Sequence, residues 1–231
     1  MNQGNKLLNV EKLNVCYGKL AVVFDVSVNI NAGEVVFLVG RNGAGKTTLL
    51  RTIAGFLQPA SGEIEFNGKN LNKTGAYKTA RMGLKYIHQD KQVFGDLTIR
   101  ENLELSSYAT KDYDWDPVFK MFPKLNTIIE RKAGNLSGGE KQMLLIAMAM
   151  IGKPALVMLD EPTEGLAPHV IKDLAAIFKE ISRTTTLFIV EQNLPLIASI
   201  ADRVYCMKEG KVVNEITTRE QISSMHFEQY L

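Results

Sequence analysis

The stretch Gly40-Arg41-Asn42-Gly43-Ala44-Gly45-Lys46-Thr47-Thr48 decides the fold of this chain of 231 residues. A short β-branched and aromatic run, 35–39, precedes it, and apolar residues at helical spacing follow it from Thr48 to Phe56. The order strand, glycine-rich loop and helix predicts a phosphate-binding loop, because glycines let backbone N–H groups converge at a helix N-terminus. We expect Lys46 to add a positive charge there and Thr47 a hydroxyl for a bound Mg²⁺. A chance glycine-rich turn is the alternative.

Composition sets limits on the class of protein. Hydrophobic residues make up 45% and charged residues 23%, and 27 basic against 25 acidic side chains leave a net charge of +2. This balance gives no electrostatic footprint for nucleic acid. Cys16 and Cys206 lie in strand-like runs and predict reduced structural thiols. Residues 1–8 lack the apolar core of a signal peptide, and the longest apolar run, 143–151, is about half of a membrane span, which predicts a chain outside the bilayer.

Strand patterns alternate with helical patterns along most of the chain. Phe24, Val26, Val28 and Ile30 alternate with polar residues, and apolar strands follow at 63–68, 84–88, 155–159 and 186–190. Interleaved strands and helices predict an α/β fold with a mainly parallel sheet. We expect this core to comprise residues 1–89 and 154–231.

The segment 90–153 has a different pattern. Helical pieces at 98–108, 117–122 and 125–132 alternate with polar loops, without a strand pattern, and Thr98 and Glu101 form a candidate capping box. The sequence therefore predicts a helical subdomain inserted into the α/β core.

Polar residues stand where three predicted strands end. Gln89 follows one strand, Asp160 and Glu161 end a fully apolar one, and Gln192 follows the last. Ligands of α/β proteins bind at such strand ends, and two carboxylates leaving a buried strand are costly unless they hold a cation or do chemistry. We expect Asp160 to be the acidic partner of Mg²⁺ and Glu161 to orient or deprotonate an attacking water. Solvated acids at a strand end are the alternative.

Two other stretches have polar or aromatic groups suited to a nucleotide. Tyr17 precedes a glycine and either packs locally or stacks on adenine. In Leu136-Ser137-Gly138-Gly139-Glu140-Lys141-Gln142, a serine and two glycines open an apolar helix, either as an N-cap with flexible glycines or as a second anion-binding surface. Because one phosphate loop needs no second one in the same subunit, the latter would serve a neighbour's nucleotide.

The motifs GRNGAGKTT, Gln89, LSGGEKQ and LVMLDEPT, in this order, resemble those of the ATP-binding subunits of ABC transporters, and the resemblance covers essentially the whole chain. Residues 164–168 and 190–193 look like those of the branched-chain amino-acid uptake ATPases and their relatives for urea and amides. The resemblance implies an ATPase with the P-loop NTPase fold of ABC ATPases, N-terminal antiparallel strands included. It also implies a peripheral protein at the cytoplasmic face of the membrane that powers a permease and depends indirectly on a solute-binding protein.

The resemblance also implies roles for individual residues. Two ATPase subunits pack head to tail, as a heterodimer in the branched-chain systems, and each ATP lies between one phosphate loop and the other subunit's LSGGE. By that pattern Tyr17 stacks on adenine, Gln89 links the γ-phosphate and Mg²⁺ to the permease, Ser137 and Gly139 contact the partner's γ-phosphate, with Gly138 and Glu140 beside them, and Glu161 is the catalytic carboxylate.

The sequence departs from the family pattern at two places. Most members have a histidine where Gln192 stands, and a glutamine there can donate a hydrogen bond to the γ-phosphate but carries no charge. Most members have a Ser-Ala-Leu-Asp-like loop after the catalytic glutamate, whereas this chain has Glu164-Gly165-Leu166-Ala167 there. The competing functions are a urea or amide uptake ATPase and a non-transport ABC ATPase acting on DNA or the ribosome.

Overall fold

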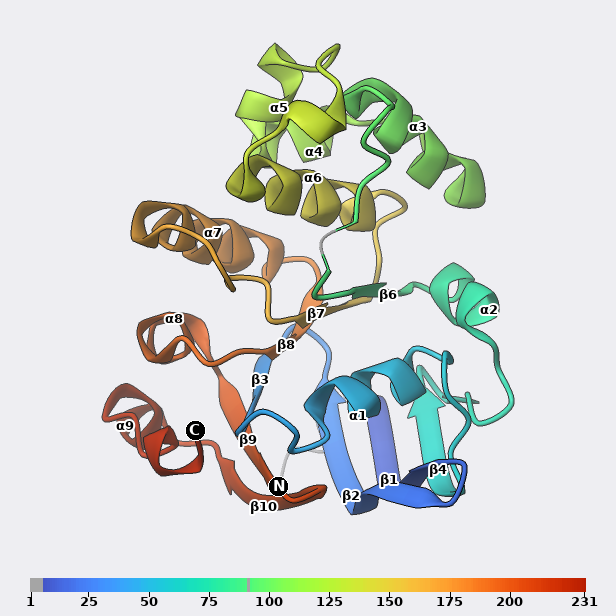
Figure 1. Cartoon of the computed structure of the whole chain (residues 1–231), viewed down its shortest axis with the longest axis vertical. Coiled ribbons are helices and arrows are strands. Elements are labelled where there is room, and N and C mark those ends of the chain that lie inside the picture. Colours follow the sequence, from blue (N-terminus) through green and yellow to red (C-terminus); the bar gives the residue numbers. More distant parts are fainter. Residues whose placement is uncertain (1–5, 91) are drawn as a thin grey trace.

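The computed structural model describes residues 6–90 and 92–231. Residues 1–5, part of the segment without a signal-peptide core, lie outside the described residues. Two sheets form the lower part of the molecule and a group of helices the upper part (Figure 1). The first sheet is antiparallel, in the order β2-β1-β4-β5. Its strands are β1 (Lys6–Tyr17), β2 (Leu20–Asn31), β4 (Ser61–Phe66) and β5 (Lys69–Asn70).

The second sheet has the order β10-β9-β3-β8-β7-β6 and is parallel from β9 to β6, while β10 pairs antiparallel with β9. The α/β class with a mainly parallel core sheet is confirmed. The strands are β3 (Val35–Val39), β6 (Leu84–Ile87), β7 (Leu156–Asp160), β8 (Thr186–Val190), β9 (Arg203–Lys208) and β10 (Lys211–Ile216).

Helices cover both faces of the parallel sheet. They are α1 (Lys46–Ile53), α2 (Ala76–Arg81), α3 (Ile99–Thr110), α4 (Asp116–Met121), α5 (Pro123–Thr127), α6 (Gly138–Met150), α7 (Pro168–Ile181), α8 (Leu194–Ile200) and α9 (Arg219–Ser223), with short 3-10 turns at Ala133–Asn135 and Glu228–Tyr230.

Strand β3 shows why this sheet is buried on both faces. Val35, Phe37 and Val39 pack into one apolar core, which also includes residues of α3 to α8, and Val36 and Leu38 pack into a second core with α1 and the antiparallel sheet. A strand between two cores needs apolar residues at every position, which explains the unbroken run 35–39. The loop after β3 is thereby anchored to a strand that is buried on both faces.

Two local expectations are wrong. Phe24 is 37% exposed, because a left-handed Asp25 (φ 49°) shifts the register of β2 between Val23 and Val26, so that Val23 is buried instead. The helix expected at 125–132 ends at Thr127, because the carbonyl groups of Ile129 and Arg131 instead accept hydrogen bonds from the first N–H groups of α3.

Candidate active site

The loop between β3 and α1 is shaped by its glycines. At Gly40 (φ 154°) a Cβ atom would lie 2.2 Å from the backbone oxygen of Met207, so only glycine fits against the neighbouring strand. Gly45 is the N-cap of α1 in a left-handed conformation (φ 101°), and no side chain caps the helix. The first N–H groups of α1 therefore remain directed at the cavity above the loop.

That cavity, of about 330 Å³, brings together the phosphate loop, Gln89 and Glu161. Its walls are Val22, the loop and first turn of α1 at 42, 43 and 45–48, Gln89, Glu161 and Glu164. Lys46, only 5% exposed, donates hydrogen bonds from Nζ to the carbonyl oxygens of Gly40 (2.6 Å) and Arg41 (3.1 Å). Burial lowers the pKa of Lys46, and the nearby carboxylates of Glu161 and Asp160 raise it in part.

Glu161 is held by residues from the ends of three neighbouring segments. Gln192 donates from Nε2 to Glu161 Oε1 (2.9 Å) and to Asn42 Oδ1 (3.0 Å). Gln89 donates from Nε2 to Glu161 Oε2 (3.3 Å) and to Glu164 Oε2 (2.8 Å). Lys46 Nζ lies 3.8 Å from Glu161 Oε1. The backbone of Glu161 is left-handed (φ 48°), a conformation that is costly for a non-glycine residue and that occurs at functional sites.

Asp160, at the end of β7, is 2% exposed. Its Oδ2 accepts a hydrogen bond of 2.9 Å from the hydroxyl of Tyr86, and its Oδ1 is buried without a hydrogen-bond partner among the described residues. Burial raises the pKa of Asp160, while the hydrogen bond from Tyr86 and the nearby Thr47 hydroxyl lower it. A buried carboxylate oxygen without a donor, beside the Thr47 hydroxyl, fits a hard divalent cation.

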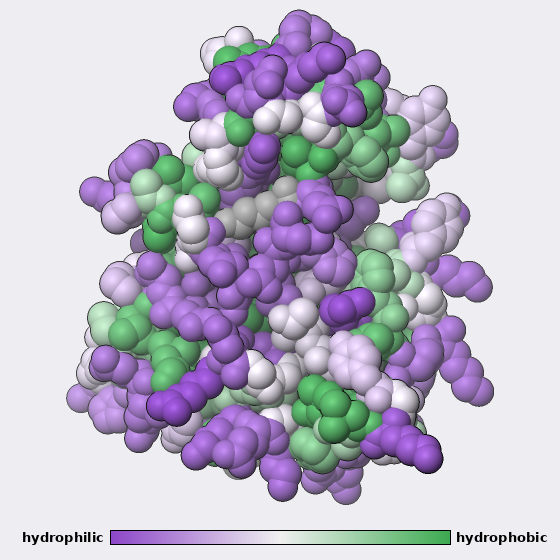
Figure 2. All heavy atoms as spheres, in the orientation of Figure 1, coloured by the Kyte–Doolittle hydropathy of each residue, from purple (hydrophilic) through white to green (hydrophobic). Residues whose placement is uncertain are grey.

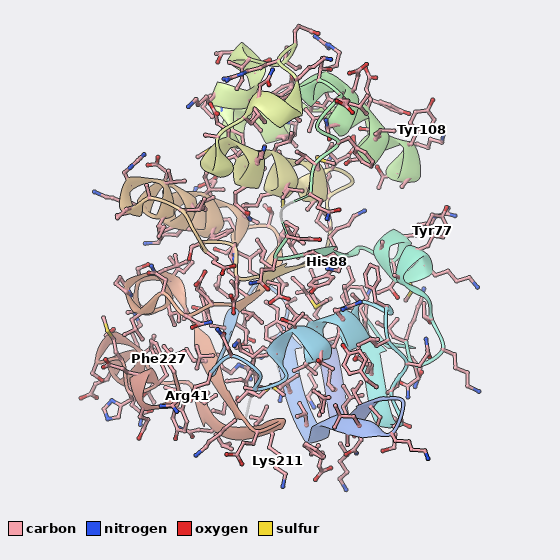
Figure 3. All side chains as sticks on the ribbon, viewed as in Figure 1. Arg41, Tyr77, His88, Tyr108, Lys211 and Phe227 are labelled. Atoms are coloured by element: carbon pink, nitrogen blue, oxygen red, sulfur yellow. The ribbon has the colours of Figure 1, made fainter. Side chains whose placement is uncertain are left out.

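Other predicted site residues lie away from this cavity. Tyr17, at the end of β1, is 42% exposed and does not line it. The Arg41 side chain donates from Nε to the carbonyl oxygen of Leu231 (3.1 Å) and so turns toward the C-terminal segment. Figure 3 labels Arg41 and Phe227 of that segment in the same part of the view. Ala44 is buried within the loop.

Residues Ser137 to Glu140 lie at the start of α6, in the upper part of the molecule and away from α1 (Figure 1). Ser137 is the N-cap: its backbone N–H donates to Glu140 Oε2 (2.8 Å), and its Oγ accepts from the backbone N–H of Glu140 (3.3 Å). The bond from the Ser137 backbone, helped by Lys124, lowers the pKa of Glu140 to about 2. At Gly139 a Cβ would lie 2.8 Å from Cγ1 of Val170, so α7 packs on this turn.

Sequence reasoning missed two supporting residues. Glu191, 4% exposed, accepts hydrogen bonds from Thr163 Oγ1 (2.7 Å) and from the backbone N–H of Gln192 (2.8 Å), so it fixes the loop that carries Gln192. Its position directly after a buried strand, like that of Asp160, was an available signal. Tyr86 gave none, because a tyrosine within a strand is ordinarily a packing residue.

Known proteins share this architecture. The family model described as ABC transporter matches residues 23–164. The high-affinity branched-chain amino acid transport ATP-binding protein BraG of Pseudomonas aeruginosa is 40% identical over 212 residues, which cover 90% of this chain and 91% of BraG. The high-affinity branched-chain amino acid transport ATP-binding protein LivG of Escherichia coli is 31% identical over 226 residues, which cover 88% of this chain and 89% of LivG.

Solved structures agree. An ATP-binding cassette of an ABC transporter named MJ1267 matches with a TM-score of 0.84 at 27% identity, covering 95% of this chain and 94% of that one. The dimeric cassette MJ0796, bound to ADP and Pi, has the same fold, with a TM-score of 0.81 at 22% identity and 91% and 98% of the two chains covered. Fold, site and matches define the class: this chain belongs to the ABC transporter family, as one of its ATP-binding, ATP-hydrolysing subunits.

No helix within 6–90 and 92–231 is both long and apolar enough to cross a bilayer.

Proposed function

We propose that this subunit hydrolyses ATP to drive the uptake of branched-chain amino acids through a membrane permease supplied by a solute-binding protein. The names and the nearly full-length matches of BraG and LivG support the solute class. The subunit would work at the cytoplasmic face of the membrane, bound to it through the permease alone.

The observation that carries the proposal is the position of Glu161, between Lys46 of the phosphate loop and the amides of Gln89 and Gln192. In the proposed reaction the N–H groups of residues 43–48 and Lys46 bind the phosphates of ATP, and Tyr17 stacks on the adenine. Glu161 accepts the proton of the attacking water, and Gln192 orients the water or the γ-phosphate by hydrogen bonding.

A magnesium ion, when bound, would neutralise phosphate charge. Thr47 Oγ1, Asp160 Oδ1 and Gln89 are the groups of this chain that would hold it or its waters, since oxygen ligands suit a hard cation. Both oxygens of Glu161 accept amide donors in the structure, and each carboxylate oxygen can accept a second hydrogen bond, so the attacking water can bind beside these amides.

We further propose a head-to-tail dimer, in which Ser137 to Glu140 of one subunit meet the nucleotide on the phosphate loop of the other. The support is their separation within this chain, because α6 and α1 lie in different parts of the molecule (Figure 1). In a branched-chain transporter the second subunit would be a different ATPase. Native mass spectrometry of the intact transporter should show one copy of this chain and one of another ATPase, and two copies of this chain would exclude the heterodimer.

A groove of about 740 Å³ is the proposed docking site for a helix of the permease. Residues of α2, β6, α3 and α6 line it, together with Ala54 and Phe56 after the end of α1. Figure 2 shows apolar side chains on both sides of the hollow between α3 and α2, at the right of the view. Figure 3 shows Tyr77 of α2 and Tyr108 of α3 on its two sides and His88 toward the centre of the molecule.

The lining of the groove also includes two charged side chains, Lys85 and Asp90. Burial lowers the pKa of Lys85, and no ion pair joins this lysine to another described residue. A largely apolar helix with one carboxylate placed near Lys85 would therefore complement that part of the groove. The substitution Tyr77→Arg should reduce the amount of permease that co-purifies with this chain, and an unchanged amount would contradict docking in the groove.

The solute assignment is tested by transport. In cells that lack this chain, uptake of radiolabelled leucine should fall to background and return when the chain is supplied, but not when Glu161→Gln is supplied. Normal leucine uptake together with lost urea uptake would overturn the assignment.

A further inference from the structure

Tyr86 of β6 contacts both the docking groove and the acidic residue at the end of β7. Its hydroxyl donates to Asp160 Oδ2 at 2.9 Å. Its ring lies 4.3 Å from the ring of His88 and 6.0 Å from that of Phe56, measured between centroids, and all three rings line the groove. One side chain therefore has its polar end at the nucleotide site and its ring in the groove.

A second cavity lies beside Tyr86, at the predicted cation site. It measures about 410 Å³, and Thr47, Gln89 and Asp160 contribute to its wall. Tyr86 and His88 line both this cavity and the groove. The wall between the proposed permease site and the predicted cation site thus consists in part of these two rings.

The hydrogen bond from Tyr86 gives the two carboxylate oxygens of Asp160 different surroundings. Because Oδ2 accepts the Tyr86 hydroxyl, the carboxylate is fixed in rotation, and Oδ1 is left without a donor. Outer partners of this kind orient a metal-binding group, and their loss typically lowers metal affinity about 10- to 100-fold.

We propose that Tyr86 is a positioning residue that fixes the Asp160 carboxylate for Mg²⁺ and makes this fixation depend on what occupies the groove. The second half of the proposal rests on the proposed function of the groove. A helix seated against Phe56 and His88 restricts the Tyr86 ring and thereby the hydroxyl that holds Asp160. Occupation of the groove and binding of Mg²⁺ should then favour each other.

The first half is tested by binding rather than turnover. In the Glu161→Gln background, ATP affinity is measured by equilibrium dialysis with Mg²⁺ and with EDTA, and the ratio of the two affinities reports the contribution of the metal. Tyr86→Phe keeps the ring and removes the hydroxyl, so the ratio should fall about tenfold or more while the affinity in EDTA stays within about twofold. The matched control is Tyr77→Phe, which removes a hydroxyl from the same groove, and it should leave the ratio unchanged.

A second variant keeps the test decisive if Tyr86→Phe does not fold. Phe56→Leu loosens the ring contact without removing the Tyr86 hydroxyl, and it should lower the ratio in the same direction by a smaller factor. Circular dichroism melting establishes that each variant is folded. A folded Tyr86→Phe or Phe56→Leu protein with the parent's ratio would overturn the positioning role.

The second half is tested in the intact transporter. The Mg²⁺ concentration for half-maximal hydrolysis should be lower with the permease than for the isolated chain, and Tyr86→Phe should abolish that difference. An equal difference in both proteins would refute the coupling and leave the positioning of Asp160 standing. If Tyr77→Arg fails to reduce co-purification of the permease, the groove assignment is wrong, and the EDTA experiment still decides the role of Tyr86.

Discussion

The starts of α1 and α6 both carry glycines, yet they differ in what they offer an anion. Helix α1 begins after Gly45 without a side-chain cap and has Lys46 as its first residue. Helix α6 begins after Ser137, and a complete capping box with Glu140 occupies two of the backbone donors. A negative carboxylate thus lies at the N-terminus of α6 and a positive ammonium at that of α1.

The difference separates two kinds of anion site. The start of α1 has open donors and a cation, so it can bind polyphosphate within its own chain. At the start of α6 the capping box takes only the N–H groups of Ser137 and Glu140. The Oγ of Ser137 only accepts a bond in the box, so its proton remains available to an outside acceptor. The two first-turn N–H groups at Gly138 and Gly139 likewise have no carbonyl partner within the helix. Such a site suits a phosphate already bound by another subunit.

The largest effect is expected at the carboxylate beside α1. Glu161→Gln keeps the shape of the side chain and removes its basicity and charge, so the chemical step should slow by about 10²-fold or more, the scale of a lost general base. ATP should still bind and accumulate in the closed dimer. Single-turnover assays measure the cleavage rate, and a normal rate would transfer the role of positioning the water to Gln192 or Gln89.

A smaller effect on a different quantity is expected for Lys46→Ala. This change removes the charge at the start of α1, and hydrogen bonds to charged groups contribute about 1.5–3 kcal/mol. ATP affinity of the isolated chain, measured by equilibrium dialysis, should fall about 10- to 150-fold. An affinity equal to that of the parent would show that the open donors of α1 bind the phosphates without the lysine.

The smallest effect is on stability at the start of α6. The pKa of Glu140 lies near 2 in the folded chain, below its ordinary value of 4.5, so its charge stabilises the fold above about pH 4.5 and ceases to do so as the pH falls through 2. Glu140→Gln should therefore lower the free energy of unfolding by about 0.5–1 kcal/mol at pH 7. In urea unfolding the difference between the two proteins should shrink from pH 4.5 downward, and a constant difference would contradict the role of the charge.

Comparison of sequence and structure shows which features are local. The phosphate loop, the strands around it and the capping box of Thr98 and Glu101 follow from short patterns, and the structure forms this box as expected. At Ser137 an N-cap was one of two expectations, and the structure adds Glu140 to complete a second capping box. Two features could not be predicted from short patterns. The exposure of Phe24 depends on a bulge in β2, and the early end of α5 depends on backbone hydrogen bonds to α3. The position of Gln192 between Asn42 and Glu161 depends on strand order, which no local pattern encodes.

The separate roles of the two helix starts can be tested with one matched pair of variants. Ser137→Asp keeps the N-cap acceptor but replaces the hydroxyl proton with a negative charge, and Thr98→Asp makes the same change in the other capping box. We predict that Ser137→Asp leaves the ATP affinity of the isolated chain within about twofold of the parent and lowers hydrolysis by the intact transporter at least about tenfold. Thr98→Asp should change neither quantity. A loss of ATP affinity in the isolated Ser137→Asp chain would contradict the account, because the start of α6 would then bind the chain's own nucleotide.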